Sequence, residues 1–453
     1  MIDTTQYKSN KYLLALTFPV FIEVLLNMLI GNVDQFMIMS YSENAYSAIG
    51  NVNQLINFFI LSFNIVAMSS TVLIAQYIGA KDIERSKKIY SLSVFVNTTF
   101  GLFVTAVVLI FYKPIFRWLE YPTAIIDDAS TYIVLIGSCL VFNALGITFA
   151  SFFKANGLMK EWMYISLLAN IVNVTGNALL LYGWFGLPKL GIVGVAISSN
   201  VSKIFAFLVV YRLYKKKIGH TISIKMLKPF PIHQFKKMLG IGVPSAGESM
   251  CFSLMTIVIQ KFINGFGQAM VTARVTVNLL SFVSWIFATA ISSTTQVVVG
   301  YLMGAKDIEG TNKRFWSSLR LSMLCTFIGS LILFFFCEPI FGIFIKDPEV
   351  LAVCKNIMFV EIFLEQGRAI NLSCVRSLQA CGDTKFPIIT GIISSWTVAV
   401  GLGYLLGVVL NFGIVGVWIG MACDELLRGM IFTMRWKRGK WRKMTLVEVD
   451  TAE

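Results

Sequence analysis

The chain has 453 residues, of which 56% are hydrophobic and only 14% are charged. Soluble proteins carry about 25% charged residues, so this composition excludes a soluble enzyme, a disordered chain and a disulfide-rich secreted scaffold. The 38 Lys and Arg against 24 Asp and Glu give a net charge of +14, which we attribute to cytoplasmic loops and not to nucleic-acid binding. We therefore predict an all-α integral membrane protein.

Twelve apolar segments follow one another along the chain, each long enough to cross a bilayer as a helix of about 20 residues. We predict them at residues 13–38, 48–77, 89–111, 128–153, 161–183, 191–212, 237–263, 269–299, 316–338, 350–376, 386–409 and 413–434. With the N-terminus placed inside, 29 of the Lys and Arg fall on the inner side, with Arg428 counted in the tail, and five fall on the outer side. This bias predicts a multi-pass protein of the cell (inner or plasma) membrane with both termini in the cytoplasm.

An internal repeat divides the twelve spans into two sets of six. The sequence GAKDIE at residues 79–84 recurs at residues 304–309, an offset of 225. Three further matches occur in the same order. Pro19 and Glu23 match Pro244 and Glu248 at an offset of 225, and Gly157 matches Gly382 at the same offset. The segment Gly191–Val195 matches Gly413–Val417 at an offset of 222. Six crossings separate equivalent points, so the two halves share one orientation and we expect a pseudo-two-fold axis along the membrane normal.

The repeat predicts four parts of the chain. They are an N-lobe at residues 1–212, a cytoplasmic linker at 213–236, a C-lobe at 237–434 and a basic cytoplasmic tail at 435–453. Two six-helix lobes around a central cavity suit transport by alternating access.

Ionisable residues within the spans are the candidate functional groups, because a charge in the bilayer core is costly unless it faces a cavity or a partner. Glu23 and Glu248 each follow a proline by four residues, on the same helix face. The proline frees a backbone carbonyl, so we interpret each pair as a polar crevice. The alternative is a protonated carboxyl that links two helices. Lys203 and Arg274 are interpreted as span-end residues that snorkel to the membrane surface, as is Lys261.

Asp34 is the lone charge among apolar or neutral neighbours in the first span. In the fifth span, Asn170, Asn173 and Asn177 are spaced i, i+3 and i+7 and share one helix face. If the two spans are neighbours, carboxylate and amide oxygens form a cluster suited to a proton or a small hard cation. The alternative is an interhelical hydrogen-bond ladder.

Glu361, Glu365 and Arg368 share one face of the tenth span at i, i+4 and i+7. Glu365 and Arg368 can pair, and a switchable pair and a permanent structural pair look the same in sequence. The sequence contains no G-x-x-x-x-G-K-[ST] phosphate loop, no H-E-x-x-H and no G-x-S-x-G motif. We therefore expect a secondary transporter, not an enzyme, that uses an ion gradient and has no cofactor besides its coupling ion.

The chain resembles the multidrug and toxic compound extrusion (MATE) family of bacterial type over about residues 10–435. Five motifs carry the resemblance: FPVFIEVLLNMLIGNVDQFMI in span one, the QYIGAKDIERSKK loop after span two, NIVNVTGNALLLYG in span five, IGVPSAGES in span seven and RSLQACGDTKFP after span ten. The resemblance implies a two-lobe rocker-switch antiporter. It would export organic, often cationic or amphipathic, compounds in exchange for H⁺ or Na⁺.

The resemblance also implies roles for single residues. Asp34 matches the aspartate of the family's N-lobe, Asn173 matches an asparagine of the same cation site, and Asn177 stands where many members have a second aspartate. We therefore expect Asp34, Asn173 and Asn177 to hold the coupling proton or, as the metal, Na⁺. Glu248 matches the glutamate of the seventh helix, and Arg368 stands where the sodium-coupled branch often has an aspartate.

We expect the remaining span carboxylates and their arginine to line the substrate cavity: Glu23, Glu248, Glu361, Glu365 and Arg368. The expected partners are small-molecule substrates and membrane lipid, not nucleic acid, and the expected state is a monomer. One alternative function remains at this stage, a flippase of lipid-linked precursors from the same superfamily, because Arg274 and Arg368 would suit an anionic headgroup.

Overall fold

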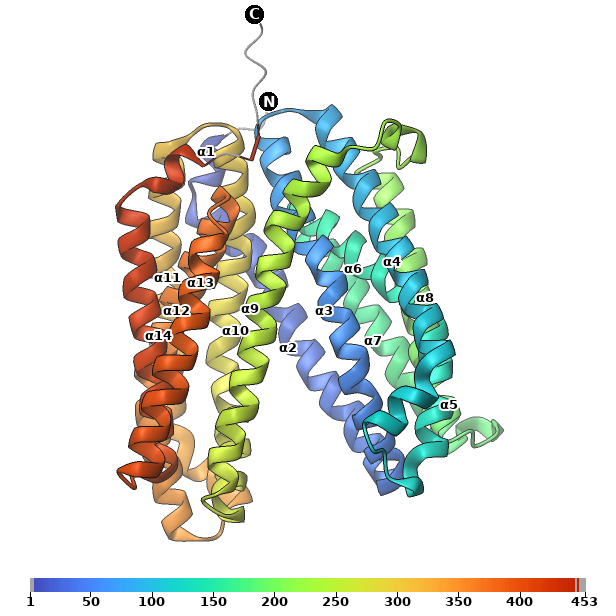
Figure 1. Ribbon diagram of the computed structural model, residues 1–453, viewed down its shortest axis with the longest axis vertical. Coiled ribbons are helices and arrows are strands. Elements are labelled where there is room, and N and C mark those ends of the chain that lie inside the picture. Colours follow the sequence, from blue (N-terminus) through green and yellow to red (C-terminus); the bar gives the residue numbers. More distant parts are fainter. Residues whose placement is uncertain (1–3, 445, 448–453) are drawn as a thin grey trace, which may run out of the picture. The chain divides into compact units, whose positions relative to one another are not determined.

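The computed structural model describes residues 4–444 and 446–447, and within these residues the chain forms helices and connecting turns with no strand (Figure 1). The helices of the first half are α1 (Thr4–Tyr7), α2 (Asn10–Tyr41), α3 (Glu43–Gly79), α4 (Ile83–Trp118), α5 (Ile126–Ser138), α6 (Leu140–Ala155), α7 (Met159–Tyr182) and α8 (Ile192–Lys217). Those of the second half are α9 (Ile232–Asn264), α10 (Gln268–Gly304), α11 (Ile308–Phe344), α12 (Pro348–Cys381), α13 (Lys385–Ser394) and α14 (Gly413–Lys437).

Each of the twelve predicted spans falls on one helix or one interrupted helix, and the helices extend up to eight residues beyond the predicted ends. The fourth span is the pair α5 and α6, which bends by 50° at Cys139. The eleventh span begins as α13 and continues as π-helix over Ser395–Leu402 and Leu405–Val409. The prediction of an all-α membrane protein with twelve spans is therefore confirmed.

Helices α12 and α14 differ from the others in composition. Among the described residues, nine helices are long and apolar enough to cross a membrane, and the bent pair α5 and α6 makes a tenth. Helices α12 and α14 are 34 and 25 residues long but are not among them, because they carry acidic and basic side chains in their middle. Helix α12 packs against α10, α11 and α14, so these charges lie inside a helix bundle and not in lipid.

The two copies of the GAKDIE repeat form the same turn. Lys81 and Lys306 both have a left-handed backbone, with φ of 61° and 58°. The next residue caps the following helix, since Asp82 Oδ1 accepts a hydrogen bond from Arg85 N at 2.9 Å and Asp307 Oδ1 accepts one from Gly310 N at 2.7 Å. The sequence repeat is thus a repeat of backbone conformation.

The glycines of this repeat bring α3 and α10 into backbone contact. A Cβ atom on Gly304 would lie 1.9 Å from the carbonyl oxygen of Gln76, and one on Gly79 would lie 2.1 Å from that of Tyr301. Gln76 and Tyr301 are themselves 225 residues apart, so the contact is reciprocal. No side chain larger than hydrogen fits at either position without separating the helices.

The chain divides into two compact units, which do not coincide with the two halves of the sequence. The first unit comprises Ile22–Ile74 and Asp82–Gly242, and the second comprises Met1–Phe21, Ala75–Lys81 and Val243–Glu453. The start of α2 therefore belongs to the unit that holds α10 to α14, and the start of α9 belongs to the unit that holds α4 to α8. The lobe and linker limits at residues 1–212, 213–236, 237–434 and 435–453 rest on the sequence repeat and stay a prediction.

A proline lies beside each of these exchanges. In α2 the boundary follows Pro19 by two residues, and in α9 it immediately precedes Val243 and Pro244. Proline inside a helix removes one backbone hydrogen bond and favours a kink. Both of these helices therefore change units next to a residue that cannot donate a backbone hydrogen bond.

Candidate functional site

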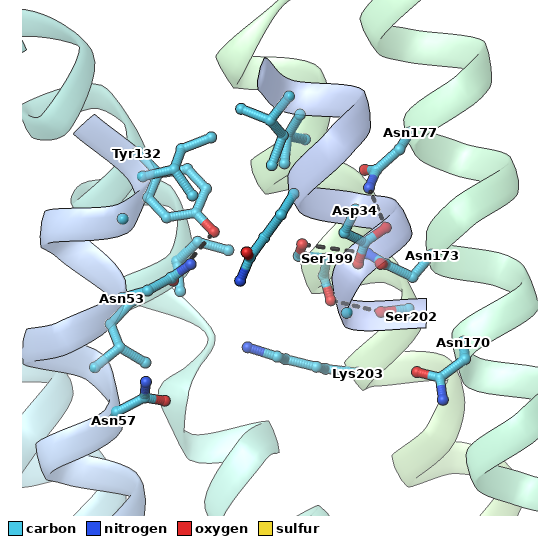
Figure 2. Close-up of a pocket in the computed structure, with 18 of the residues that line it drawn as sticks. Asp34, Asn53, Asn57, Tyr132, Asn170, Asn173, Asn177, Ser199, Ser202 and Lys203 are labelled. Atoms are coloured by element: carbon cyan, nitrogen blue, oxygen red, sulfur yellow. Dashed lines mark hydrogen bonds between the residues drawn. The ribbon is translucent and has the colours of Figure 1, made fainter. Parts of the chain in front are cut away.

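A polar cavity of about 590 Å³ lies in the first unit (Figure 2). It is bounded by side chains of α2, α3, α7 and α8, with Tyr132 and Ile136 from α5. This volume is within the range of about 300–1,000 Å³ that is typical of small-molecule sites. We refer to it as the Asp34 cavity.

Asp34 projects into this cavity from α2 and is held by the neighbouring α7. Its Oδ1 accepts a hydrogen bond from Asn177 Nδ2 at 3.0 Å. Asn177 is 1% exposed, and its own Oδ1 has no hydrogen-bond partner among the described residues. A half-buried carboxylate is therefore hydrogen-bonded to a buried amide group whose own oxygen is unpaired.

The other two asparagines of the predicted stripe also line the Asp34 cavity. Asn173 Nδ2 donates to Ser199 Oγ of α8 at 3.3 Å, and Ser198 Oγ donates to the Asn173 carbonyl at 2.7 Å. Asn170 Nδ2 donates to Asn27 Oδ1 of α2 at 2.6 Å. The stripe thus links α7 to α2 and to α8, and the structure brings Asp34, Asn173 and Asn177 to one cavity. Their role in ion coupling stays a prediction.

Lys203 is a member of this site that the sequence did not reveal. It lines the Asp34 cavity from α8, one turn after Ser199 (Figure 2). The interpretation that it snorkels from a span end is wrong, because Lys203 lies near the middle of α8 and lines the cavity. Its place near the middle of the predicted span at residues 191–212 was the signal that could have found it.

Glu23 has a structural environment of its own. Its Oε1 accepts hydrogen bonds from Trp162 Nε1 at 2.7 Å and from Lys154 Nζ at 3.2 Å. Glu23 is 8% exposed, and these contacts link α2 to α6 and α7. Glu23 does not line the Asp34 cavity, and its predicted place in a substrate cavity stays a prediction.

The second unit contains a buried charge network on α12 and α14. Arg368 forms an ion pair with Glu365 and lies 4.0 Å from Glu361 Oε1. Glu361 Oε2 accepts a hydrogen bond from Trp418 Nε1 at 2.8 Å. Glu361 and Glu365 are 3% and 0% exposed, so the predicted face of α12 points into the bundle.

Helix α14 supplies the other half of this network. Arg428 pairs with Asp424 at 2.6 Å and with Glu425 at 2.9 Å. Glu425 Oε2 also accepts from Asn371 Nδ2 at 2.7 Å, and Ser394 Oγ donates to Asp424 Oδ1 at 2.5 Å. We call these contacts, together with Glu361, Glu365 and Arg368, the α12–α14 network. It places four carboxylates against two guanidinium groups.

Sequence analysis missed the α14 part of this network. The assignment of Arg428 to the basic tail is wrong, because α14 runs to Lys437 and Arg428 is 5% exposed. Asp424, Glu425 and Arg428 share the i, i+3 and i+4 spacings of helical ion pairs, and this was the signal available.

Glu248 of α9 lies close to the network without a direct ion pair among the described residues. Its charge interacts with Arg376 of α12 and with Arg428. A Cβ atom on Gly391 of α13 would lie 3.8 Å from Glu248 Oε1, so this carboxyl group faces α13. The cavity roles predicted for Glu248, Glu361, Glu365 and Arg368 stay predictions.

Comparison with known proteins agrees with this architecture. A family model described as MatE matches residues 19–179 and 244–405, two segments that begin 225 residues apart, as the internal repeat does. The uncharacterised transporter YisQ of Bacillus subtilis is 33% identical over 432 residues, which cover 95% of this chain and 94% of that protein. A probable multidrug resistance protein NorM of Thermotoga maritima is 27% identical over 446 residues, which cover 97% of this chain and 94% of that protein.

Solved structures show the same fold. The MATE transporter VcmN of Vibrio cholerae superposes with a TM-score of 0.87 at 16% identity, over 98% of this chain and 100% of that chain. A MATE crystal structure in the straight conformation gives the same score and identity, over 97% of this chain and 98% of that chain. The family match covers most of the sequence, and the chain therefore belongs to the MatE family of multi-pass membrane transporters.

Proposed function

We propose that this protein is a secondary active multidrug efflux antiporter, which exports organic compounds in exchange for H⁺ or Na⁺ by rocker-switch alternating access. The names of relatives such as the probable multidrug resistance protein NorM support the export of drugs. The observation that carries the coupling is the placement of Asp34 in a small-molecule cavity, hydrogen-bonded to a buried asparagine whose oxygen is unpaired.

The donor set around Asp34 fits either coupling ion. A carboxylate can take up a proton, and the oxygens of Asp34, Asn173 and Asn177 are the hard ligands that a small cation such as Na⁺ prefers. Either ion neutralises Asp34, so the cavity alternates between two charge states. Coupling requires that the substrate bind these two states with different affinity, and the loss of a negative charge from the cavity wall supplies that difference.

The proposal retains the predicted orientation, with both chain ends in the cytoplasm of a bacterial cell, and a monomer as the working unit. The inward movement of the coupling ion down its gradient then drives the outward movement of the substrate. Neutralisation of Asp34 from the outside would lower the affinity for substrate on the side where it is released.

The test is transport in liposomes that contain the purified full-length protein. A fluorescent organic cation is loaded, and a pH gradient or a Na⁺ gradient is imposed separately. We expect wild-type protein to move the dye on one of the two gradients, which identifies the ion. Asp34→Asn should abolish gradient-driven movement, whereas Asp127→Asn, at an exposed aspartate in the first turn of α5, should not.

Two results would contradict the proposal. Normal gradient-driven transport by Asp34→Asn would exclude Asp34 as the coupling group. Absence of transport on either gradient with a range of dyes would favour the flippase alternative. Of the two arginines named for that alternative, Arg368 is paired with Glu365, so Arg274 is the one that could bind a headgroup. Arg274 is 7% exposed and its Nη1 has no hydrogen-bond partner among the described residues.

A further inference from the structure

Lys203 gives the Asp34 cavity a positive charge that efflux of simple organic cations does not require. Its side chain extends from α8 into the cavity, towards the wall that carries Asn53 and Asn57 (Figure 2). Within residues 4–444 and 446–447 it forms no hydrogen bond and no ion pair. An ionisable group inside a membrane protein is costly and is kept where it meets a partner or a pathway.

The charge balance of the cavity limits which solutes it attracts. Asp34 and Lys203 are the acidic and basic side chains among its described lining residues. When both are ionised the cavity has no net charge, and when Asp34 is neutralised the cavity is positive. A solute that is only a cation therefore meets no net attraction in the first state and repulsion in the second.

The rest of the lining favours hydrogen bonding over stacking. Seven amide side chains and two serines line the cavity beside Ile, Val, Ala and Gly residues, and the aromatic residues among the described lining are Tyr46 and Tyr132, with no Phe or Trp. Trp, Tyr and Phe faces stabilise a desolvated organic cation by cation–π contact, and Trp does so best. The chain contains 37 Phe and 9 Trp, so their absence from this wall distinguishes it from the rest of the molecule.

We propose that the Asp34 cavity binds amphoteric solutes, which carry both an amine and a carboxylate, with the carboxylate at Lys203 and the protonated amine at Asp34. This inference rests on the proposed function, because it assumes that Asp34 is the coupling group. The coupling ion then competes with the amine for Asp34, which keeps the exchange an antiport. Lys203 holds the other end of the solute and supplies the charge-assisted hydrogen bond that selects for a carboxylate.

The experiment compares two dyes that differ in one functional group. A rhodamine with a free benzoate is amphoteric, and its methyl ester is a cation of nearly the same shape. Binding of each to the purified full-length protein in detergent is followed by fluorescence anisotropy. We expect wild type to bind the free acid about tenfold to a hundredfold more tightly than the ester, the range that one hydrogen bond between charged groups supplies.

Variants then assign the preference to Lys203. Lys203→Gln should remove the preference by weakening the free acid, while the cationic ester binds at least as tightly as before because Asp34 is no longer balanced. Lys203→Arg should retain the preference. Lys261→Gln, at an exposed lysine of α9, is the matched control and should leave both affinities unchanged. If wild type binds the two dyes equally, or if Lys203→Gln leaves the preference for the free acid as it was, the inference is wrong.

The wild-type comparison keeps the inference testable even if a Lys203 variant does not fold. Transport separates its failure from that of the proposed function. If the protein binds both dyes equally but exports the ester on an ion gradient, the inference is overturned and the antiporter proposal stands. Selective binding of the free acid without transport of either dye on an ion gradient would overturn the antiporter and retain the carboxylate site.

Discussion

The reciprocal contact between α3 and α10 predicts that alanine is not tolerated at Gly304. The new Cβ atom would lie 1.9 Å from the Gln76 oxygen, whereas ordinary contacts begin at 3.4 Å. The two helices must therefore separate by about 1.5 Å, and overpacking of this kind costs about 1–3 kcal/mol. The equivalent change at Gly79 requires about 1.3 Å at the same crossing, by the same overpacking argument.

The assay is thermal unfolding of the purified protein in detergent, followed by tryptophan fluorescence. Gly304→Ala and Gly79→Ala should each lower the unfolding temperature. The double variant should cost less than the two single costs together, because the first separation makes room for the second methyl group. Gly146→Ala in α6 is the control: no atom lies within 4 Å of its Cβ position, so the change should stabilise the helix by about 0.5–1 kcal/mol.

One result would refute this reasoning. If Gly304→Ala unfolds at the wild-type temperature, then α3 and α10 do not make this backbone contact in solution. Equal effects of Gly304→Ala and Gly146→Ala would likewise show that the loss reflects alanine in a helix and not the crossing.

Two further predictions concern charged groups. Arg428→Met removes the cation that two buried carboxylates share, so it should destabilise the protein by about 3–5 kcal/mol in the same unfolding assay. Arg438→Met, at an exposed arginine, is the control and should leave the stability unchanged. If the two variants are equally stable, the α12–α14 network is contradicted. Burial raises the pKa of Asp307, but hydrogen bonds from Lys8 and the Gly310 amide lower it more, so its pKa lies below the ordinary 3.8. The ionised carboxylate therefore stabilises the folded chain above its unfolded pKa, and this stabilisation is lost as the pH falls through the lower folded pKa. Asp307→Asn, which keeps the helix cap, should be less stable than wild type by about 0.2–1 kcal/mol at pH 7. The difference should begin to shrink near pH 3.8 and vanish only below the lower folded pKa. A constant difference across unfolding curves from pH 3 to 7 would contradict the Lys8 pair.

The spans could be predicted from sequence because the bilayer imposes one requirement on every helix, about 20 apolar residues. The same requirement does not predict where each helix ends, because a helix can continue beyond the apolar residues. Helices α8 and α14 continue beyond their apolar stretches, to Lys217 and Lys437. Lys203 and Arg428 have another explanation: the predicted spans at residues 191–212 and 413–434 already enclose them, but their charge was attributed to the membrane surface and not to an interior partner or cavity.

The contact between Asp34 and Asn177 was within reach of sequence analysis, because helical spacing fixes which asparagines share a face. The partners of Glu23 were not. Lys154 and Trp162 lie more than 130 residues away, and only packing of three helices brings them to one carboxylate. Charge and spacing identify a residue that needs a partner, but the partner is decided by tertiary structure.

The start of α2 lies in the second unit and the start of α9 in the first, and this arrangement affects the order in which the two units can fold during synthesis. The first unit is complete in sequence once the ribosome has passed Gly242, while Met1–Phe21 belong to the second unit. Contacts over such long separations in sequence form slowly. The first unit can therefore fold while most of the second is still being translated, and the start of α2 can take its final place in the second unit only afterwards.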